Sequence, residues 1–350
     1  MNRKPIRKTR TFFSEQEREE RVSSLPDPLV RLNNLIPWEE FRTILSCVRK
    51  PSLKGGRPPY DEIFMLKCLV LQELYGLSDE KLEFEICNRR DFERFLGMDI
   101  TSDIPDHSTI NNFRNQLKAH NLVIKLHEVF NRFLQEEGLI LRKGVIVDAT
   151  FVESPRRHCT REENRQINSG SSIPEVFPDK SVQSNSHRDG DARWTVKNGR
   201  AHFGYKDHIV CDSKSKFIIQ YEVTPANVHD SQELINLIPP TVTNEEPFYA
   251  DAAYDSRAIH KELLERGFIP RIIKSARRFR SLTAEDREEN RKKSSTRRRI
   301  EHVFGDIKNR RNGLRIMTIG LARAKTKTGL INLVYNMRRY QTITTRCLQF

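Results

Sequence analysis

The sequence predicts a mixed α/β fold, in which an all-α N-terminal domain precedes a second domain built on a mixed sheet. Between residues 61 and 140, apolar side chains recur with the spacing of amphipathic helices, and capping and turn residues separate one predicted helix from the next. From Gly144 onward, short apolar runs typical of strands appear. After residue 228, strands and helices alternate, which is typical of a sheet covered by helices.

The helical region begins with a well-marked helix. Asp61 is a good N-cap after two prolines, and Gly76 is a good C-terminal stop, so a helix is predicted over 61–76. Four more helices are expected, over 78–90, 91–98, 108–120 and 122–138. Short helices joined by tight turns are compatible with a helix-turn-helix DNA reader, and equally compatible with any small helical bundle.

The second region is expected to contain three antiparallel strands and then alternating helices and strands, giving a mixed five-stranded sheet. The predicted strands cover 145–153, 203–212, 216–226, 247–254 and 269–274, with a hairpin turn at Ser213–Lys216. The predicted helices cover 230–240, 256–267, 295–311 and 327–343. Residues 154–201 are poor in apolar side chains and are expected to form a surface insertion, and 275–293 a charged link.

These segments divide the chain into three parts. Residues 1–24 are charged and expected to be loosely ordered. Residues 25–140 form the helical domain, and residues 141–350 form the sheet domain with its polar insertion.

Charge is distributed very unevenly along the chain. The net charge is +14, and residues 271–350 hold 22 Lys and Arg against six Asp and Glu. From Ile307 to the last residue there are ten basic residues and no acidic one. A solvated surface normally mixes both signs, so this segment favours a polyanion, above all nucleic acid, over a solubility role or an acidic lipid or protein partner.

Other classes of protein are disfavoured. No window approaches the roughly 20 consecutive apolar residues that a membrane-spanning helix needs, and the basic first residues are not followed by the apolar run of a secretory signal. The six cysteines form no CxxC pair and no zinc spacing, and are interpreted as reduced thiols of a cytoplasmic protein.

Three acidic residues occupy unusual places. Asp148 lies inside an apolar strand, where an unpaired carboxylate costs several kcal/mol. Asp251 ends the apolar run PFYAD at 247–251, where open α/β sheets expose their ligand crevice. Glu301 lies on a predicted helix with Arg297 and Lys308 on the same face.

Each acid taken singly is more often a cap, a turn residue or half of a surface ion pair. Together, carboxylates that converge without enough basic partners require a hard cation such as Mg²⁺. Two such ions can assist phosphodiester displacement. From spacing and composition alone, however, a metal-dependent nuclease is not the favoured interpretation.

Five sequence blocks resemble, in order, the core blocks of DDE transposases of bacterial insertion sequences. The blocks are VIVDATFVESP, HFGYKDHIVCD, VTPANVHDSQ, FYADAAYDS and RRRIEHVFGDIKNRRNGLR. The helical segments beginning at GRPPYDEIF and IPDHSTINN resemble the N-terminal region of one branch, that of insertion sequence 5 within the insertion sequence 4/5 superfamily. The resemblance covers roughly residues 55–340.

The resemblance implies an RNase H-like catalytic domain in which Asp148, Asp251 and Glu301 are both the catalytic and the metal-binding triad. It implies two Mg²⁺ ions, with Mn²⁺ as a substitute, double-stranded DNA as the partner, and a homodimer or larger assembly on DNA. It also implies supporting roles for the PANVHDS block. The DNA-binding candidates are Arg297, Arg298, Lys308, Arg310 and Arg311, and the supporting candidates are Asn227, His229 and Asp230.

The chain departs from the family pattern at two positions. Ser294 stands where the family has Tyr before the Arg and Glu of its signature, which removes a tyrosine contact to DNA. Ala253 stands where the family has Gly, and its methyl group is tolerable unless the backbone there needs a positive φ.

The leading hypothesis is an active transposase that binds the inverted repeats of its own element and performs magnesium-dependent cleavage and strand transfer. It would be cytoplasmic and associated with the nucleoid when bound to DNA. The alternatives are a transposase-derived DNA-binding protein without catalysis and a structure-specific nuclease of RNase H fold. A covalent recombinase is disfavoured, because no cluster of a nucleophile with arginines is apparent.

Overall fold

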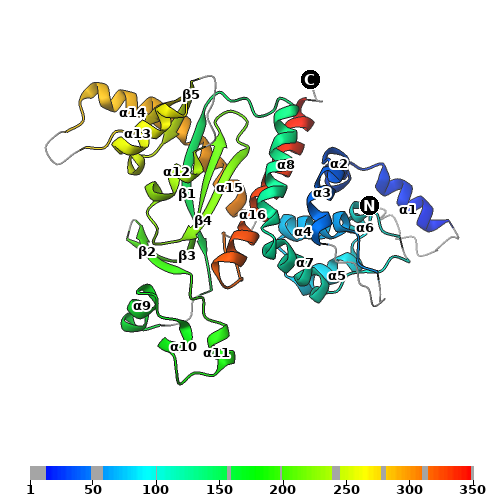
Figure 1. The fold of residues 1–350 in the computed structure, drawn as a ribbon. Helices are drawn as coiled ribbons and strands as arrows, with labels where there is room; N and C mark the ends of the chain where they lie inside the picture. Colours follow the sequence, from blue (N-terminus) through cyan, green and yellow to red (C-terminus); the bar gives the residue numbers. More distant parts are fainter. Residues whose placement is uncertain are drawn as a thin grey trace, which may run out of the picture.

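The computed structural model describes residues 13–48, 58–99, 101–155, 159–197, 199–238, 245–276, 281–309 and 314–347. The N-terminal helices lie to one side of a twisted sheet, and a long C-terminal helix packs against both (Figure 1). The insertion extends from one end of the sheet, away from the N-terminal helices (Figure 1). No helix among these residues is long and apolar enough to span a membrane.

The described part of the N-terminal region is helical, as predicted. Its elements are α1 (Ser14–Ser23), α2 (Pro28–Leu35), η1 (Trp38–Phe41), α3 (Arg42–Leu45), η2 (Ser46–Val48), α4 (Glu62–Tyr75), α5 (Asp79–Asn88), α6 (Arg90–Leu96), α7 (His107–Ala119) and α8 (Leu122–Glu136). Asp61 caps α4 by accepting the N–H groups of Ile63 and Phe64, and Gly76 ends it at a φ of 65°. Of the segment expected to be loosely ordered, residues 1–12 lie outside the described residues, and Ser14–Ser23 form α1.

Within the described residues, the sheet has six strands. They are β1 (Val145–Glu153), β2 (Arg193–Lys197), β3 (Arg200–Asp212), β4 (Ile218–Pro225), β5 (Glu246–Ala250) and β6 (Phe268–Ile272). The long strand β3 is antiparallel to β1, β4 and β2, whereas β5 is parallel to β1 and β6 is parallel to β5. The five predicted strands therefore lie in the order β4–β3–β1–β5–β6, which is the RNase H-like arrangement.

The sixth strand, β2, comes from the segment expected to be a surface insertion. Gly204 of β3 pairs with Glu153 of β1 and with Arg193 of β2, so β2 extends the edge of β3 that β4 also occupies. The insertion also contains α9 (Arg161–Asn168), α10 (Ile173–Val176) and α11 (Val182–Ser186). Most side chains of β2 are exposed, which is why its sequence lacks the apolar run of a core strand.

Helices cover both faces of the sheet. Val145, Val147 and Phe248 pack in one hydrophobic cluster with α12 (Asp230–Leu237) and α13 (Arg257–Glu265). Ile146 and Val152 pack on the opposite face with α15 (Arg299–Asn309) and α16 (Leu321–Cys347). The 3₁₀ turn η3 (Ala252–Tyr254) follows β5, and α14 (Ala284–Arg297) leads into α15.

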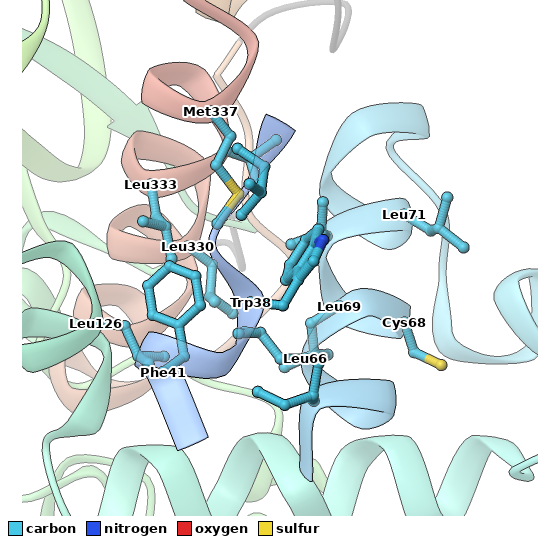
Figure 2. Close-up of a cluster of buried hydrophobic side chains, with 14 of the residues drawn as sticks. Trp38, Phe41, Leu66, Cys68, Leu69, Leu71, Leu126, Leu330, Leu333 and Met337 are labelled. Atoms are coloured by element: carbon cyan, nitrogen blue, oxygen red, sulfur yellow. The ribbon is translucent and has the colours of Figure 1, made fainter. Parts of the chain in front are cut away.

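Helix α16 belongs to two cores. Its residues Leu330, Leu333 and Met337 lie among the side chains of η1, α4 and α8, including Phe41 and Leu126 (Figure 2). Other residues of the same helix pack against the sheet cluster that contains β1 and α15. The last helix of the chain therefore contributes to the hydrophobic core of the N-terminal helices as well as to that of the sheet.

Candidate active site

Asp148 and Asp251 lie on adjacent strands. In the parallel β1–β5 ladder, Val145 pairs with Phe248 and Ile146 with Tyr249. Continued beyond this ladder, the same offset aligns Asp148 with Asp251, the residue that directly follows β5. Side chains alternate along a strand, so Asp148 lies on the same face as Ile146, which α15 covers.

Asp148 is held by two donors in a largely buried position. Its Oδ1 accepts the backbone N–H of Ala149 at 2.8 Å, and its Oδ2 lies 2.6 Å from Nη1 of Arg297. Burial raises the pKa of Asp148 above its ordinary value, and the charge of Asp251 raises this pKa as well. The bond from Ala149 and the charge of Arg297 oppose that increase.

Asp251 marks the end of β5. Its Oδ1 accepts the N–H of Ala252 at 2.6 Å, at the start of η3. Ala253 does not have a positive φ, so alanine in place of the family's glycine causes no backbone strain here. Tyr254 is buried behind this turn, and its hydroxyl has no hydrogen-bond partner within the described structure.

Glu301 comes from the first turn of α15. Ile300, Val303 and Phe304 anchor this helix on the sheet, while the Glu301 side chain remains 57% exposed. Its Oε1 lies 3.6 Å from Nη2 of Arg297. The guanidinium of Arg297 thus joins Asp148 to Glu301, and its buried Nε has no hydrogen-bond acceptor among the described residues.

The other predicted DNA-binding residues fall in different settings. Arg298 is exposed at the junction of α14 and α15. Lys308 is partly buried, and burial lowers its pKa, while the charge of Asp148 acts in the opposite direction. Arg310 and Arg311 lie outside the described residues.

The PANVHDS block lies between β4 and α12. Asn227 is exposed in the turn. Asp230 accepts a hydrogen bond from the ammonium of the buried Lys206 at 2.8 Å. His229, rather than Asp230, is the N-cap of α12, because its side chain accepts the N–H of Ser231. Asp230 instead pairs with Lys206, a partner that the sequence did not indicate.

The donor chemistry of the three acids fits a hard divalent cation, since carboxylates supply only oxygen ligands. The arrangement does not bring all three together: within the described ranges, no group of three His, Cys, Asp or Glu side chains is close enough to hold a metal ion. Asp148 and Asp251 are aligned by the register of β1 and β5, whereas Glu301 is linked through Arg297 to Asp148.

Comparison with known protein families assigns the chain to one of them. Residues 140–337, more than half of the chain, match the model described as the transposase DDE domain, and residues 16–116 match the transposase domain DUF772. The chain therefore belongs to the DDE transposase family, and is a metal-dependent enzyme of DNA cleavage and strand transfer. Its membership of the insertion sequence 5 branch stays a prediction.

A cryo-EM structure of a piggyBac transposase synaptic complex with hairpin DNA has a TM-score of 0.45 to this chain, at 12% sequence identity. The similarity covers 93% of this chain and 77% of that chain.

Proposed function

We propose that this protein is an active transposase that cuts the ends of its own insertion sequence and joins them to target DNA. Asp148, Asp251 and Glu301 are the metal-binding and catalytic residues, and double-stranded DNA is the substrate. The observation that carries the proposal is the β1–β5 register, which aligns Asp148 with Asp251, together with the link from Asp148 through Arg297 to Glu301.

The reaction is two successive displacements at phosphorus. In the first, water attacks the phosphodiester at the element's end, and the bond from phosphorus to the 3′ oxygen breaks to leave a 3′-hydroxyl. In the second, that hydroxyl attacks a target phosphodiester and releases a target 3′-hydroxyl, so that the number of phosphodiester bonds is unchanged. When bound, two Mg²⁺ ions supply activation of the attacking oxygen and stabilisation of the leaving oxygen.

Arg297 has two roles in this proposal. In the structure it balances the charge of Asp148 and contacts Glu301. With divalent cations held by these carboxylates, the guanidinium would be available to a DNA phosphate, and its Nε, which has no acceptor among the described residues, would supply an additional donor. Lys308 and Arg298 then bind neighbouring phosphates from α15 and its junction with α14. Arg310 and Arg311 extend this basic segment along the sequence.

The uneven distribution of charge indicates that two regions of the chain have different roles in DNA binding. Residues 61–140 contain nine Lys and Arg against fifteen Asp and Glu, whereas residues 271–350 are strongly basic. We therefore assign most phosphate contacts to the C-terminal region. Base recognition at the inverted repeats falls to the helical domain, where α7 exposes the amides of Asn111, Asn112 and Gln116, side chains of the type that pairs with adenine. A homodimer or larger assembly would hold both ends.

The test uses a supercoiled plasmid that carries the gene for this chain with its flanking sequence on both sides. Incubation with MgCl₂ is expected to yield breaks at two fixed positions that bracket the gene, and products in which those ends are joined to new sites. EDTA is expected to abolish both. Breaks without joined products would indicate a nuclease, and binding without breaks would indicate a DNA-binding protein without catalysis.

A further inference from the structure

The helical domain contains an open cavity of about 510 Å³ between α7 and the start of α4. Its apolar lining includes the buried side chains of Val48, Met65 and Phe113. Tyr60 also lines the cavity, and its ring is held by a stack on Phe64, with ring centres 5.8 Å apart and planes 14° apart. A cavity of this volume with a largely apolar lining is typical of a ligand-binding site.

Helix α7 contributes two amide side chains to the same cavity. Asn112 and Gln116 both line it and are exposed, and they lie one helical turn apart on one face of the helix. Within the described part of the chain, neither side-chain amide forms a hydrogen bond. Each amide offers a donor and an acceptor, so the two are available to a ligand that presents hydrogen-bonding groups along one edge.

The charged residues of the cavity disfavour a phosphate as that ligand. Among the described residues that line it, Glu62 and Asp106 are acidic and none is Lys, Arg or His. Asp106 is the N-cap of α7 and accepts the N–H of Thr109 at 2.6 Å. An anion would be repelled by these carboxylates. A neutral, planar group with hydrogen-bonding atoms on its edge fits the lining better, and in DNA the bases are the groups of this kind.

The concave shape distinguishes this site from a helix face that reads a groove. A recognition helix projects its side chains toward base edges that stay inside the duplex. A cavity instead receives a group that projects from the DNA, and a base can project only when it has left the stack. Such a base is held by apolar or aromatic side chains against its ring and by hydrogen bonds to its edge. The lining of this cavity supplies both.

We propose that this cavity binds one base that is turned out of the duplex at the end of the element. Asn112 and Gln116 would bind the edge of the base, while Tyr60 and Phe113 would contact its ring. The inference rests on the proposed function and deepens it. It gives the helical domain a site that tests the identity of one base of the inverted repeat, in addition to the contacts that α7 makes in a groove.

The test uses duplexes that span one end mapped in the plasmid assay, each with 2-aminopurine at a different position. The fluorescence of this base analogue rises when it leaves the base stack. Binding of the wild type is expected to raise the fluorescence several-fold at one position, and the double variant Asn112→Ala, Gln116→Ala should lose most of that increase. Gln135→Ala, which removes an exposed amide on α8 outside the cavity, should match the wild type.

Base selectivity at the position found in this way is the second measurement. Changing the natural base there is expected to lower the affinity of the wild type by roughly tenfold, and that of the double variant by less than about twofold. Both substituted side chains are exposed, so the circular dichroism of the double variant should equal that of the wild type.

Two results would contradict this inference alone. One is no fluorescence increase at any position while the wild type cleaves the unlabelled duplex normally. The other is an increase that the double variant retains in full, because the base would then leave the stack without the help of these amides. Wild-type protein that neither binds nor cleaves the duplex would contradict the proposed function as well.

Discussion

Glu301→Gln is expected to abolish strand cleavage while leaving DNA binding near the wild-type level. The substitution keeps the size of the side chain but removes the charge that a divalent cation requires. Metal assistance is worth several kcal/mol in the transition state, so the cleavage rate should fall by about a thousandfold or more. Because the side chain is 57% exposed and its ion pair within the described residues is a 3.6 Å contact with the guanidinium of Arg297, the fold should remain intact.

The measurement is single-turnover cleavage of a labelled duplex, with affinity determined separately by a gel-shift titration. Glu288→Gln is the matched control, since Glu288 is an exposed acid on α14 that pairs with Arg291. It should cleave at the wild-type rate. Cleavage by Glu301→Gln within a few-fold of the wild type would remove Glu301 from the triad.

Asn336→Ala is expected to cause a large loss of stability. Asn336 is fully buried on α16. Its Oδ1 accepts Ile218 N–H at 2.9 Å, and its Nδ2 donates to Ile218 O at 2.8 Å and to Asn131 Oδ1 at 3.1 Å. Alanine leaves these buried groups without their partner, at about 1–3 kcal/mol for each group. We therefore expect the free energy of unfolding to fall by about 3–5 kcal/mol.

Asn336 is important because it connects separate parts of the structure. Asn131 is on α8, and its Nδ2 donates to Ile219 O of β4 at 2.7 Å, so one amide network joins the N-terminal helices, the last helix and the edge of the sheet. Urea unfolding followed by circular dichroism measures the effect. Thr342→Ala, at an exposed position of the same helix, should stay within about 0.5 kcal/mol of the wild type. Equal stabilities of the two variants would contradict a structural role for the network.

Much of the fold could be predicted from the sequence where local signals agree with burial. The helix that starts after Asp61 and ends at Gly76 has both its N-terminal and its C-terminal capping residue in the sequence, and the structure confirms both. The hairpin turn at Ser213–Lys216 is also confirmed, with Lys216 at a φ of 65°. The five apolar strands were predictable because their side chains enter the core.

Elements with polar surfaces could not be predicted in the same way. Strand β2 is held by its ladder with β3 rather than by buried side chains, so its pattern resembles that of a loop. The segment expected to be a charged link contains most of α14, a helix started by the capping box of Thr283 and Asp286. Nor is the helix expected over 295–311 continuous, because α14 ends at Arg297 and α15 begins at Arg299.

The residues of the candidate site could be predicted from the sequence, but the contacts between them could not. The strand positions of Asp148 and Asp251 follow from the sequence, and the β1–β5 register then aligns them. Arg297 links Asp148 to Glu301 because the chain breaks between α14 and α15. No local signal in the sequence indicates this break.

The most direct test of the central claim is an anomalous-scattering map from crystals of the wild-type protein with a DNA end, soaked in Mn²⁺. The account predicts a manganese peak bound by the carboxylates of Asp148 and Asp251, with Glu301 turned toward it and Arg297 released to a DNA phosphate. Absence of any peak at these carboxylates, with Asp148 still bonded to Arg297 and Glu301 directed to solvent, would contradict it.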